Sequence, residues 1–481
     1  IALLTGQSVG REGPSIHLGA TAGSALGRAL RIPNNSVRVM VGCGVAAAIA
    51  AAFNTPLAGV IFAMEVVIMD YSVIGFAPVI IAAVSATSLT RIVFGDEASV
   101  VIPDFSIDAV REIPMMVILG AVIGCISAAF IHITLLTSSL FAKQKIWFRA
   151  SIAGFLTGLI ALFLPQVMGA GYDTVNDLLW AQIGLSAVLL LTVAKLLTSA
   201  TAIGLGIPAG LIGPTLFIGA AAGAAIGSIA SIFTPVTVGT GFYAMLGMAA
   251  MMAATLQAPL AALIYLLELT ANHAIILPGM AAVISALLVT RVVFNKSSIY
   301  QHLMLSRGLD YRNTPASKTL RRIGVASVMD RNIVQQTRYL SREQASSLIQ
   351  VQASPWLLLE ASNEQKRSLL PVSDLALHLS QLDAQERAKA DVGINSMDAK
   401  TIEGKTAEIS NIKDQQIDLM AIPAKRLEAK PIGIIATLQE AYEQMQLENC
   451  EVLVVTGAHG ATKERVYGVI TKEHIERSYQ P

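Results

Sequence analysis

Long runs of apolar residues that contain no charged side chain dominate the first 300 positions of the chain. Residues 113–142, 196–267 and 269–290 hold no Asp, Glu, Lys or Arg. A membrane-spanning helix needs about 20 apolar residues, so each run is long enough to cross a bilayer. A soluble protein would have to bury 72 consecutive uncharged residues between Lys195 and Glu268. The pattern therefore predicts an all-α, polytopic membrane domain.

Glycine and proline interrupt many of the apolar segments that we expect to be helical. Several segments are too short to span a bilayer, and broken helices at membrane depth are tolerated only where they pack in protein or line a cavity. The expected helices cover residues 14–29, 36–51, 56–70, 73–94, 113–141, 148–163, 181–199, 213–232, 241–254, 258–270, 274–293 and 297–306.

The composition changes after this domain and becomes that of a soluble protein. Residues 1–300 hold 12 Lys and Arg and 11 Asp and Glu, whereas residues 301–481 hold 22 and 22. Soluble proteins carry about a quarter charged residues. We therefore expect a membrane domain at residues 1–309, a polar linker at 310–322 and a small α/β domain at 323–481.

The predicted α/β domain divides into two βαβ-like halves, 323–380 and 423–481, with the highly charged residues 381–422 between them as a long insertion. Short apolar segments that alternate with helical patterns are typical of βαβ units. This interpretation depends on the segments 325–330 and 368–373 in the first half, and on a helix at 437–445 and strands at 451–455 and 466–471 in the second.

Charge and cysteine content exclude some classes of function. The net charge is +1, so nothing in the charge balance points to nucleic acid as a partner. The spacing of Cys43, Cys125 and Cys450 fits neither a disulfide framework nor a metal site, and we expect no metal or cofactor. The chain opens at Ile1 inside a motif-bearing segment, and we expect further helices to precede it.

An internal repeat is the most informative feature of the membrane domain. Residues 10–27 (GREGPSIHLGATAGSALG) align without gaps on residues 210–227 (GLIGPTLFIGAAAGAAIG), with nine of eighteen positions identical. Residues 51–65 align in the same order on residues 254–268, and both segments end in Glu. Paired, interrupted helices in two halves are the best sequence indication of a transporter's binding site.

The glycine- and proline-rich starts of the aligned segments predict an anion site. Pro14 and Pro214 suit the first turn of a helix, where the missing N–H group costs nothing. The glycines ahead of them let the backbone approach a bound group, and the free N–H groups and the helix dipole attract an anion. Two such starts meeting at mid-membrane would coordinate an anion without a full positive charge.

Glu12 stands at the first of these helix starts, where its carboxylate would compete with an anion. An ionised Glu12 would occupy the site and a protonated Glu12 would leave it, so one residue would be both gate and proton carrier. The helix dipole alone also favours an acid in a first turn, whereas an ionisable residue at membrane depth is a functional candidate by default. The residue pattern leaves both interpretations open.

These motifs resemble those of the CLC family of chloride channels and proton/chloride exchangers, bacterial type. Residues 6–14 (GQSVGREGP) are similar to the signature around the family's gating glutamate, residues 204–214 (GLGIPAGLIGP) to its second selectivity segment, and residues 298–300 (SIY) to the position of its pore tyrosine. The resemblance implies a homodimer of independent pathways in the inner (plasma) membrane, each with an inverted repeat of broken and tilted helices.

The resemblance also implies roles for individual residues. Chloride would be the transported ligand and Glu12 the gate, with backbone N–H groups at the helix starts and a tyrosine hydroxyl around the anion. The positions that the family motifs mark as anion-binding are Gly10, Arg11, Gly13, Gly210, Leu211, Ile212 and Tyr300.

One position departs from the proton-coupled members of the family. Those members carry a second, inner glutamate directly after the position of Glu65, where this chain has Val66. Valine cannot carry a proton, so the departure favours a chloride channel or a weakly coupled carrier, with a proton/chloride exchanger as the alternative.

Two further classes of protein are remote alternatives. An intramembrane enzyme would need a nucleophile–base pair or a metal cluster in the helices, and we find neither motif, so no catalytic residue is expected. A cation transporter would need more membrane carboxylates to pair with its cation.

The α/β domain resembles the cytoplasmic CBS-domain pair that many CLC proteins carry, with a degenerate first copy. Such pairs often bind adenine nucleotides, and the resemblance suggests a contact at Thr471. The alternative is that the pair serves only for dimerisation.

Overall fold

The chain forms two compact units. Residues 1–30 and 36–312 make up the first, here called the membrane unit, and residues 31–35 and 313–481 the second, the α/β unit. The computed structural model describes residues 2–71, 73–95, 112–208, 210–233, 239–306, 308, 315–350, 355–359, 367–394, 416–424, 426–459 and 463–478.

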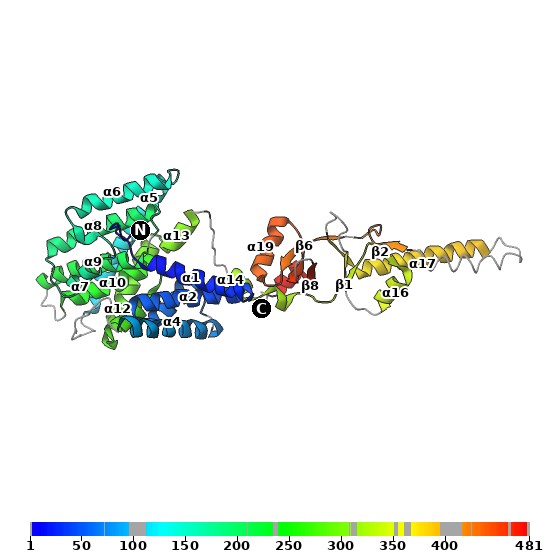
Figure 1. Cartoon of the computed structure of the whole chain (residues 1–481), viewed down its shortest axis with the longest axis horizontal. Helices are drawn as coiled ribbons and strands as arrows, with labels where there is room; N and C mark the ends of the chain where they lie inside the picture. The colour runs from blue at the N-terminus through cyan, green and yellow to red at the C-terminus, as the bar shows by residue number, and fades with distance from the viewer. Residues whose placement is uncertain are drawn as a thin grey trace. The chain divides into compact units, whose positions relative to one another are not determined.

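The membrane unit is built from apolar helices (Figure 1). Within the described residues, six are long and apolar enough to cross a membrane: Asn34–Phe53, Gly75–Phe94, Ile113–Leu140, Leu185–Gly204, Ile212–Ile232 and His273–Val293. Its elements are α1 (Glu12–Ala29), α2 (Asn34–Phe53), α3 (Pro56–Phe62), η1 (Ala63–Ile68), α4 (Val73–Phe94), α5 (Ile113–Leu140), α6 (Ile146–Ala161), η2 (Pro165–Val167), α7 (Tyr172–Leu179), α8 (Leu185–Gly204), α9 (Ile212–Phe233), α10 (Thr240–Leu256), α11 (Pro259–Thr270), η3 (His273–Ile275), α12 (Ile276–Leu288), η4 (Val289–Val293) and α13 (Ile299–Ser306).

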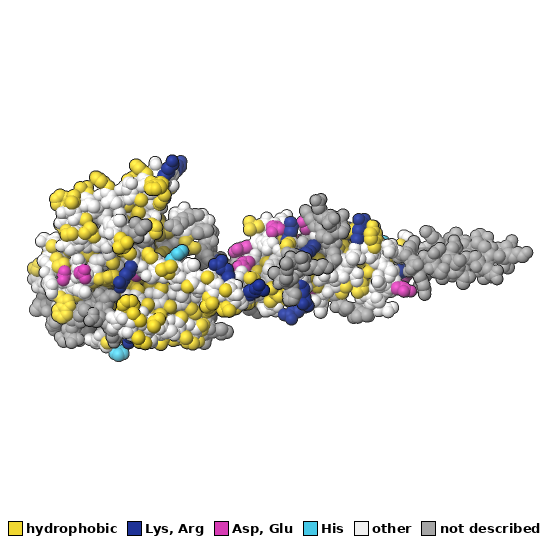
Figure 2. Space-filling view, in the orientation of Figure 1, with side chains coloured by type: hydrophobic (Ala, Val, Ile, Leu, Met, Phe, Trp, Pro, Cys, Tyr) yellow, Lys and Arg dark blue, Asp and Glu magenta, His cyan; other side chains and the backbone are white. Residues whose placement is uncertain are grey.

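The face of this unit seen in Figure 2 is rich in apolar side chains. Ile92, Phe155 and Phe163 expose 81%, 73% and 82% of their surface. Soluble monomers rarely expose large contiguous apolar patches, so these faces are suited to lipid. The prediction of a helical, multi-pass membrane unit followed by a small α/β unit is confirmed.

Glycines bring paired helices together at equivalent places in the two repeats. A Cβ atom on Gly19 of α1 would lie 2.1 Å from the carbonyl oxygen of Gly44 in α2. A Cβ atom on Gly219 of α9 would lie 2.3 Å from the carbonyl oxygen of Gly247 in α10. Small residues let membrane helices approach closely, and here aligned positions make the same backbone contact twice.

The glutamates that end the aligned segments cap helices of the opposite repeat. The Glu65 carboxylate accepts hydrogen bonds from two backbone N–H groups in the first turn of α11, at 3.2 and 2.7 Å. The Glu268 carboxylate accepts from two in the first turn of α3, at 2.8 and 2.7 Å. Such N–H groups have no acceptor within their own helix, and the dipole there favours negative charge. Each carboxylate therefore ties one repeat to the other.

One helix of the membrane unit was not predicted. The sequence pattern indicated a helix at 181–199, but the structure has α7 before it and α8 from Leu185. Short α7 carries Asp173 and Asp177 on exposed positions and buries Leu178 among other residues. Its eight residues are fewer than the window over which a helical period is read from sequence.

The α/β unit contains a six-stranded sheet with helices and a separate two-stranded sheet. Its elements are α14 (Pro315–Arg322), α15 (Val325–Val328), β1 (Ile333–Gln336), β2 (Tyr339–Ser341), α16 (Arg342–Gln350), β3 (Trp356–Leu359), β4 (Ser368–Pro371), α17 (Val372–Ile394), β5 (Gln416–Asp418), β6 (Leu427–Gly433), α19 (Leu438–Glu448), β7 (Val452–His459), β8 (Lys463–Thr471) and α20 (Lys472–Arg477).

The two halves of this unit repeat one topology. In the first half β1 pairs in parallel with β3, and β3 pairs antiparallel with β4. In the second half β6 pairs in parallel with β7, and β7 pairs antiparallel with β8. A helix, α16 or α19, separates the parallel strands in each half. Strands β4 and β6 pair antiparallel and join the halves into one sheet.

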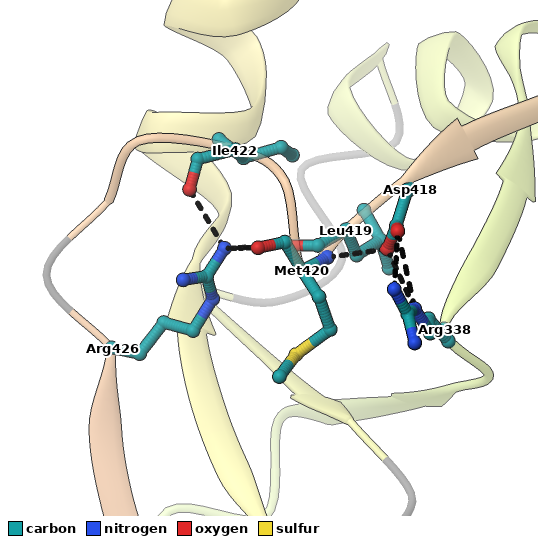
Figure 3. Close-up of polar contacts among 6 residues, drawn as sticks. All are labelled: Arg338, Asp418, Leu419, Met420, Ile422 and Arg426. Carbon is teal, nitrogen blue, oxygen red and sulfur yellow. Dashed lines mark hydrogen bonds and ion pairs between the residues drawn. The ribbon is translucent and has the colours of Figure 1, made fainter.

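Two arginines fix the turn that follows β5 (Figure 3). Arg338 binds the Asp418 carboxylate through two nitrogens, at 3.0 and 2.7 Å, and this contact holds the pKa of Asp418 below its usual value. Arg426 donates to three backbone carbonyl groups between residues 419 and 422. The guanidinium group of Arg426 thus donates hydrogen bonds to carbonyl groups of this turn that have no strand partner in the two-stranded sheet.

Parts of the predicted linker and of the first half differ from expectation. Residues 315–322 form α14, because Pro315 suits a helix start and Leu320 is buried in the core of the second half. The segment 325–330 opens with the short helix α15 instead of a strand. Residues 310–314 lie outside the described part of the chain.

The predicted insertion is also partly structured. Residues 381–394 continue α17, and residues 416–418 form β5, which pairs with β2. Residues 395–415 lie outside the described part of the chain. Residues 381–385 lie at exposed or half-buried positions of this helix, and composition alone does not distinguish a charged helix from a loop.

The reciprocal caps predict a stability effect. Glu268→Ala should lower the free energy of unfolding by about 1–3 kcal/mol, because two N–H groups at the start of α3 lose a charged acceptor. Glu268→Gln keeps one carbonyl acceptor and should lose less. Thermal unfolding of the purified protein in detergent measures both. Equal stability of Glu268→Ala and the unsubstituted protein would show that the caps do not hold the repeats together.

Candidate anion-binding site

The two repeats meet through their backbones just ahead of α1 and α9. The N–H group of Gly10 donates to the carbonyl oxygen of Gly210 at 3.0 Å, and the N–H group of Gly210 donates to that of Gly10 at 2.9 Å. The two residues form an antiparallel bridge. Because α1 begins at Glu12 and α9 at Ile212, two residues beyond each glycine, the bridge brings both helix N-termini to one place.

Glu12 is fully buried at this junction. Its Oε1 accepts a hydrogen bond from the Tyr172 hydroxyl, whereas its Oε2 has no hydrogen-bond partner among the described residues. A Cβ atom on Gly10 or Gly210 would lie 1.9 or 2.5 Å from Oε2, and one on Gly213 would lie 3.1 Å from Oε1. The carboxylate therefore fills a space, lined by glycines, between the two helix starts.

The structure brings most of the predicted anion-binding positions around this carboxylate. The N–H groups in the first turn of a helix have no acceptor within that helix, and the dipole makes this end attractive to anions. Leu211 and Ile212 are buried, with 3% and 2% of their surfaces exposed. The positions that meet here are Gly10, Gly13, Gly210, Leu211 and Ile212.

Two tyrosines from other helices lie within electrostatic range of Glu12. Tyr300 of α13 is packed against the apolar core of the membrane unit. Tyr265 of α11 is buried, and its hydroxyl has no hydrogen-bond partner among the described residues. The place of Tyr300 at the site and its contact with an anion stay predictions.

Arg11 differs from the other predicted positions because it is exposed. Its guanidinium group donates to the carbonyl oxygen of Ala52 at 3.2 Å and lies 5.4 Å from the centroid of the Tyr172 ring. These contacts orient the start of α1 and put positive charge on the exposed side of the junction.

Two residues near Glu12 were missed by the sequence analysis. Lys195 of α8 is fully buried and within electrostatic range of Glu12. It is the one charged residue between Asp177 and Glu268, and this isolation in an apolar run was a usable signal. Tyr172 had no such signal, because a tyrosine at a membrane helix end is most often an interfacial residue.

Val66 lies in the π-helical segment η1 and packs against the apolar core of the membrane unit. Its neighbour Glu65 caps α11, so that carboxylate has a structural contact. The chain therefore places no titratable group at position 66.

Thr471 is the N-cap residue of α20. Its hydroxyl accepts a hydrogen bond from the N–H group of His474 at 3.4 Å, and the His474 ring accepts one from the N–H group of Thr471 at 3.3 Å. These contacts account for the residue as a helix cap, and its contact with a nucleotide stays a prediction.

Comparisons with known proteins agree with the sequence motifs. A family model described as "Voltage gated chloride channel" matches residues 1–291. The chain is 30% identical over 313 residues to "H(+)/Cl(-) exchange transporter ClcA" of Vibrio cholerae serotype O1, covering 63% of this chain and 67% of the relative. It is 32% identical over 326 residues to "Putative chloride channel protein ClcB-like" of Ralstonia nicotianae, covering 66% of this chain and 75% of the relative.

Solved structures share the fold. A slow cyanobacterial Cl-/H+ antiporter superposes with a TM-score of 0.59 and 25% identity, over 65% of this chain and 75% of that one. A eukaryotic CLC transporter superposes with a TM-score of 0.53 and 19% identity, over 98% of this chain and 77% of that one.

The glycine-lined junction predicts a specific pattern of stability changes. Gly10→Ala should lower the free energy of unfolding by about 1–3 kcal/mol, because its methyl group would overlap Oε2 of Glu12. Adding Glu12→Ala removes the carboxylate and should restore most of that loss. Gly210→Ala is the matched control, because its methyl group would also lie 2.6 Å from the backbone nitrogen of Gly13, which Glu12→Ala leaves in place.

Thermal unfolding in detergent of these single and double variants measures the pattern. The geometry is contradicted if the cost of Gly10→Ala persists in full after the Glu12 carboxylate has been removed.

Proposed function

The chain belongs to the voltage gated chloride channel (CLC) family, and we propose that it exchanges chloride for protons across a membrane, with Glu12 as gate and proton acceptor. The observation that carries this proposal is the buried carboxylate between the starts of α1 and α9. That place combines two helix N-termini, which favour an anion, with a group that can bind a proton.

In the proposed cycle, the Glu12 carboxylate and chloride compete for the space between the two helix starts. The ionised carboxylate of Glu12 holds the space between the helix starts and blocks an anion. When Glu12 binds a proton, it loses its charge and its attraction to the helix N-termini, and chloride takes the space. When chloride leaves, the proton is released on the other side and the carboxylate returns. The ionised carboxylate and chloride thereby occupy the space in turn, and Glu12 carries the proton while chloride is there.

Two observations bear on the choice between exchange and channel conduction. The relatives named as proton/chloride exchangers favour exchange over the channel that Val66 led us to expect. Val66 remains a specific argument for a second candidate, a chloride channel or weakly coupled carrier, because the apolar core around it offers no carboxylate at that position. In an exchanger, protons would have to reach Glu12 without a titratable group at position 66.

We further propose that chloride contacts Leu211, Ile212 and the Tyr300 hydroxyl. The protein would act as a homodimer in the plasma membrane, with the α/β unit on the cytoplasmic side. The two-half topology of that unit supports the expected CBS-domain pair, with Thr471 as a candidate nucleotide contact.

Glu12→Gln tests the proposed role directly. We expect liposomes containing the unsubstituted full protein to move protons uphill when a chloride gradient is imposed without a pH gradient. Glu12→Gln should keep chloride flux and lose proton flux, because an amide cannot carry the proton. Asp177→Asn, on an exposed acid of α7, is the control and should leave both fluxes unchanged.

Chloride flux without protons in the unsubstituted protein would favour the channel candidate. Proton coupling that survives Glu12→Gln would exclude Glu12 as the proton carrier.

A further inference from the structure

Tyr172 supplies the hydrogen bond that Glu12 makes in this structure. Its hydroxyl donates to Oε1 of Glu12, and no other side-chain donor to that carboxylate is found among the described residues. Tyr172 opens α7, which belongs to neither pair of aligned segments. The bond therefore reaches the junction of the two repeats from outside the repeated motifs.

The loop before Tyr172 is held by a buried cation. The ammonium group of Lys195 donates to the carbonyl oxygens of Val167 and Gly169, at 2.9 and 2.8 Å, and lies 4.7 Å from the centroid of the Phe217 ring. Gly171, immediately before Tyr172, has a φ of 77°. A Cβ atom there would meet the Phe217 ring at 2.6 Å, so this turn requires glycine.

The ring of Tyr172 is held from two further sides. Arg11 lies over it, 5.4 Å from the ring centroid, and Phe53 packs edge-on against it with 6.3 Å between ring centroids. The loop held by Lys195, together with the side chains of Arg11 and Phe53, directs the Tyr172 hydroxyl at Oε1 of Glu12. A donor positioned this firmly loses little side-chain freedom when it makes the bond.

We propose that Tyr172 is a positioning residue that latches Glu12 in the anion path. This inference rests on the proposed role of Glu12 as the gate. A hydrogen bond to an ionised carboxylate is roughly twice as strong as one between neutral groups, so the bond favours the ionised, blocking Glu12. Protonation of Glu12 weakens the same bond and releases the side chain.

Among the described residues, other polar groups near Glu12 make no hydrogen bond to its carboxylate. Lys195, Tyr265 and Tyr300 are within electrostatic range, and Arg11 lies on the exposed side. These groups stay in place when the Tyr172 hydroxyl is removed, so a Tyr172→Phe variant isolates the latch.

The test is a double-mutant cycle of chloride flux from liposomes, using the full protein and the variants Tyr172→Phe, Glu12→Gln and both together. Tyr172→Phe keeps the ring and its contacts with Arg11 and Phe53, so folding should be unaffected. We expect it to raise chloride flux at neutral pH by about tenfold, because the blocking state loses a charge-assisted bond. In the Glu12→Gln background the same change should have no further effect.

Tyr265→Phe is the matched control, because that hydroxyl is also buried near Glu12 but bonds to no described residue. It should leave chloride flux unchanged. The latch is refuted if Tyr172→Phe leaves flux unchanged, or if its effect is the same with Gln at position 12. If Glu12→Gln itself leaves chloride and proton flux unaltered, the proposed function fails. An effect of Glu12→Gln without one of Tyr172→Phe removes only the latch.

Discussion

The backbone bridge between Gly10 and Gly210 is the contact on which the site depends, because it determines where α1 and α9 begin. An anion inside a membrane needs hydrogen-bond donors, yet a full positive charge in contact with it would oppose its release. Paired helix starts supply partial charges from backbone groups alone. Those groups must come within a few ångströms of each other, and glycine is the residue that permits it. A methyl group at either bridge position would overlap the Glu12 carboxylate.

Close glycine contacts and helix N-termini that bind a negative group recur elsewhere in the membrane unit. Gly19 with Gly44 and Gly219 with Gly247 join α1 to α2 and α9 to α10 at corresponding glycines. Glu65 and Glu268 then cap helices of the opposite repeat. These two caps are made between the repeats, and two separately folded halves would leave those helix N–H groups without their carboxylate acceptors. Contacts between the repeats therefore help to hold both the site and the fold.

The structural features that could be predicted from sequence are those that occur in both repeats. Apolar length located most helices, and the aligned motifs located Glu12 and its glycines. The parts that could not be predicted occur once. Helix α7 is short and polar on one side. Tyr172 contacts Glu12 across 160 positions of sequence. The hydrogen bonds of Lys195 go to carbonyl groups in a loop. Spacing carries no information about such contacts.

Lys195 bears on the proposed replacement of the Glu12 carboxylate by chloride. Its ammonium group is satisfied by two carbonyl oxygens, and no acid makes an ion pair with it among the described residues. A positive charge on Lys195 would favour one negative charge nearby, whether on a carboxylate or on chloride. In the proposed cycle, an ionised Glu12 and a chloride beside a protonated Glu12 each place one negative charge near Lys195. A charged Lys195 would therefore be compatible with the proposed replacement of carboxylate by chloride, a replacement that would begin when a proton reaches Glu12.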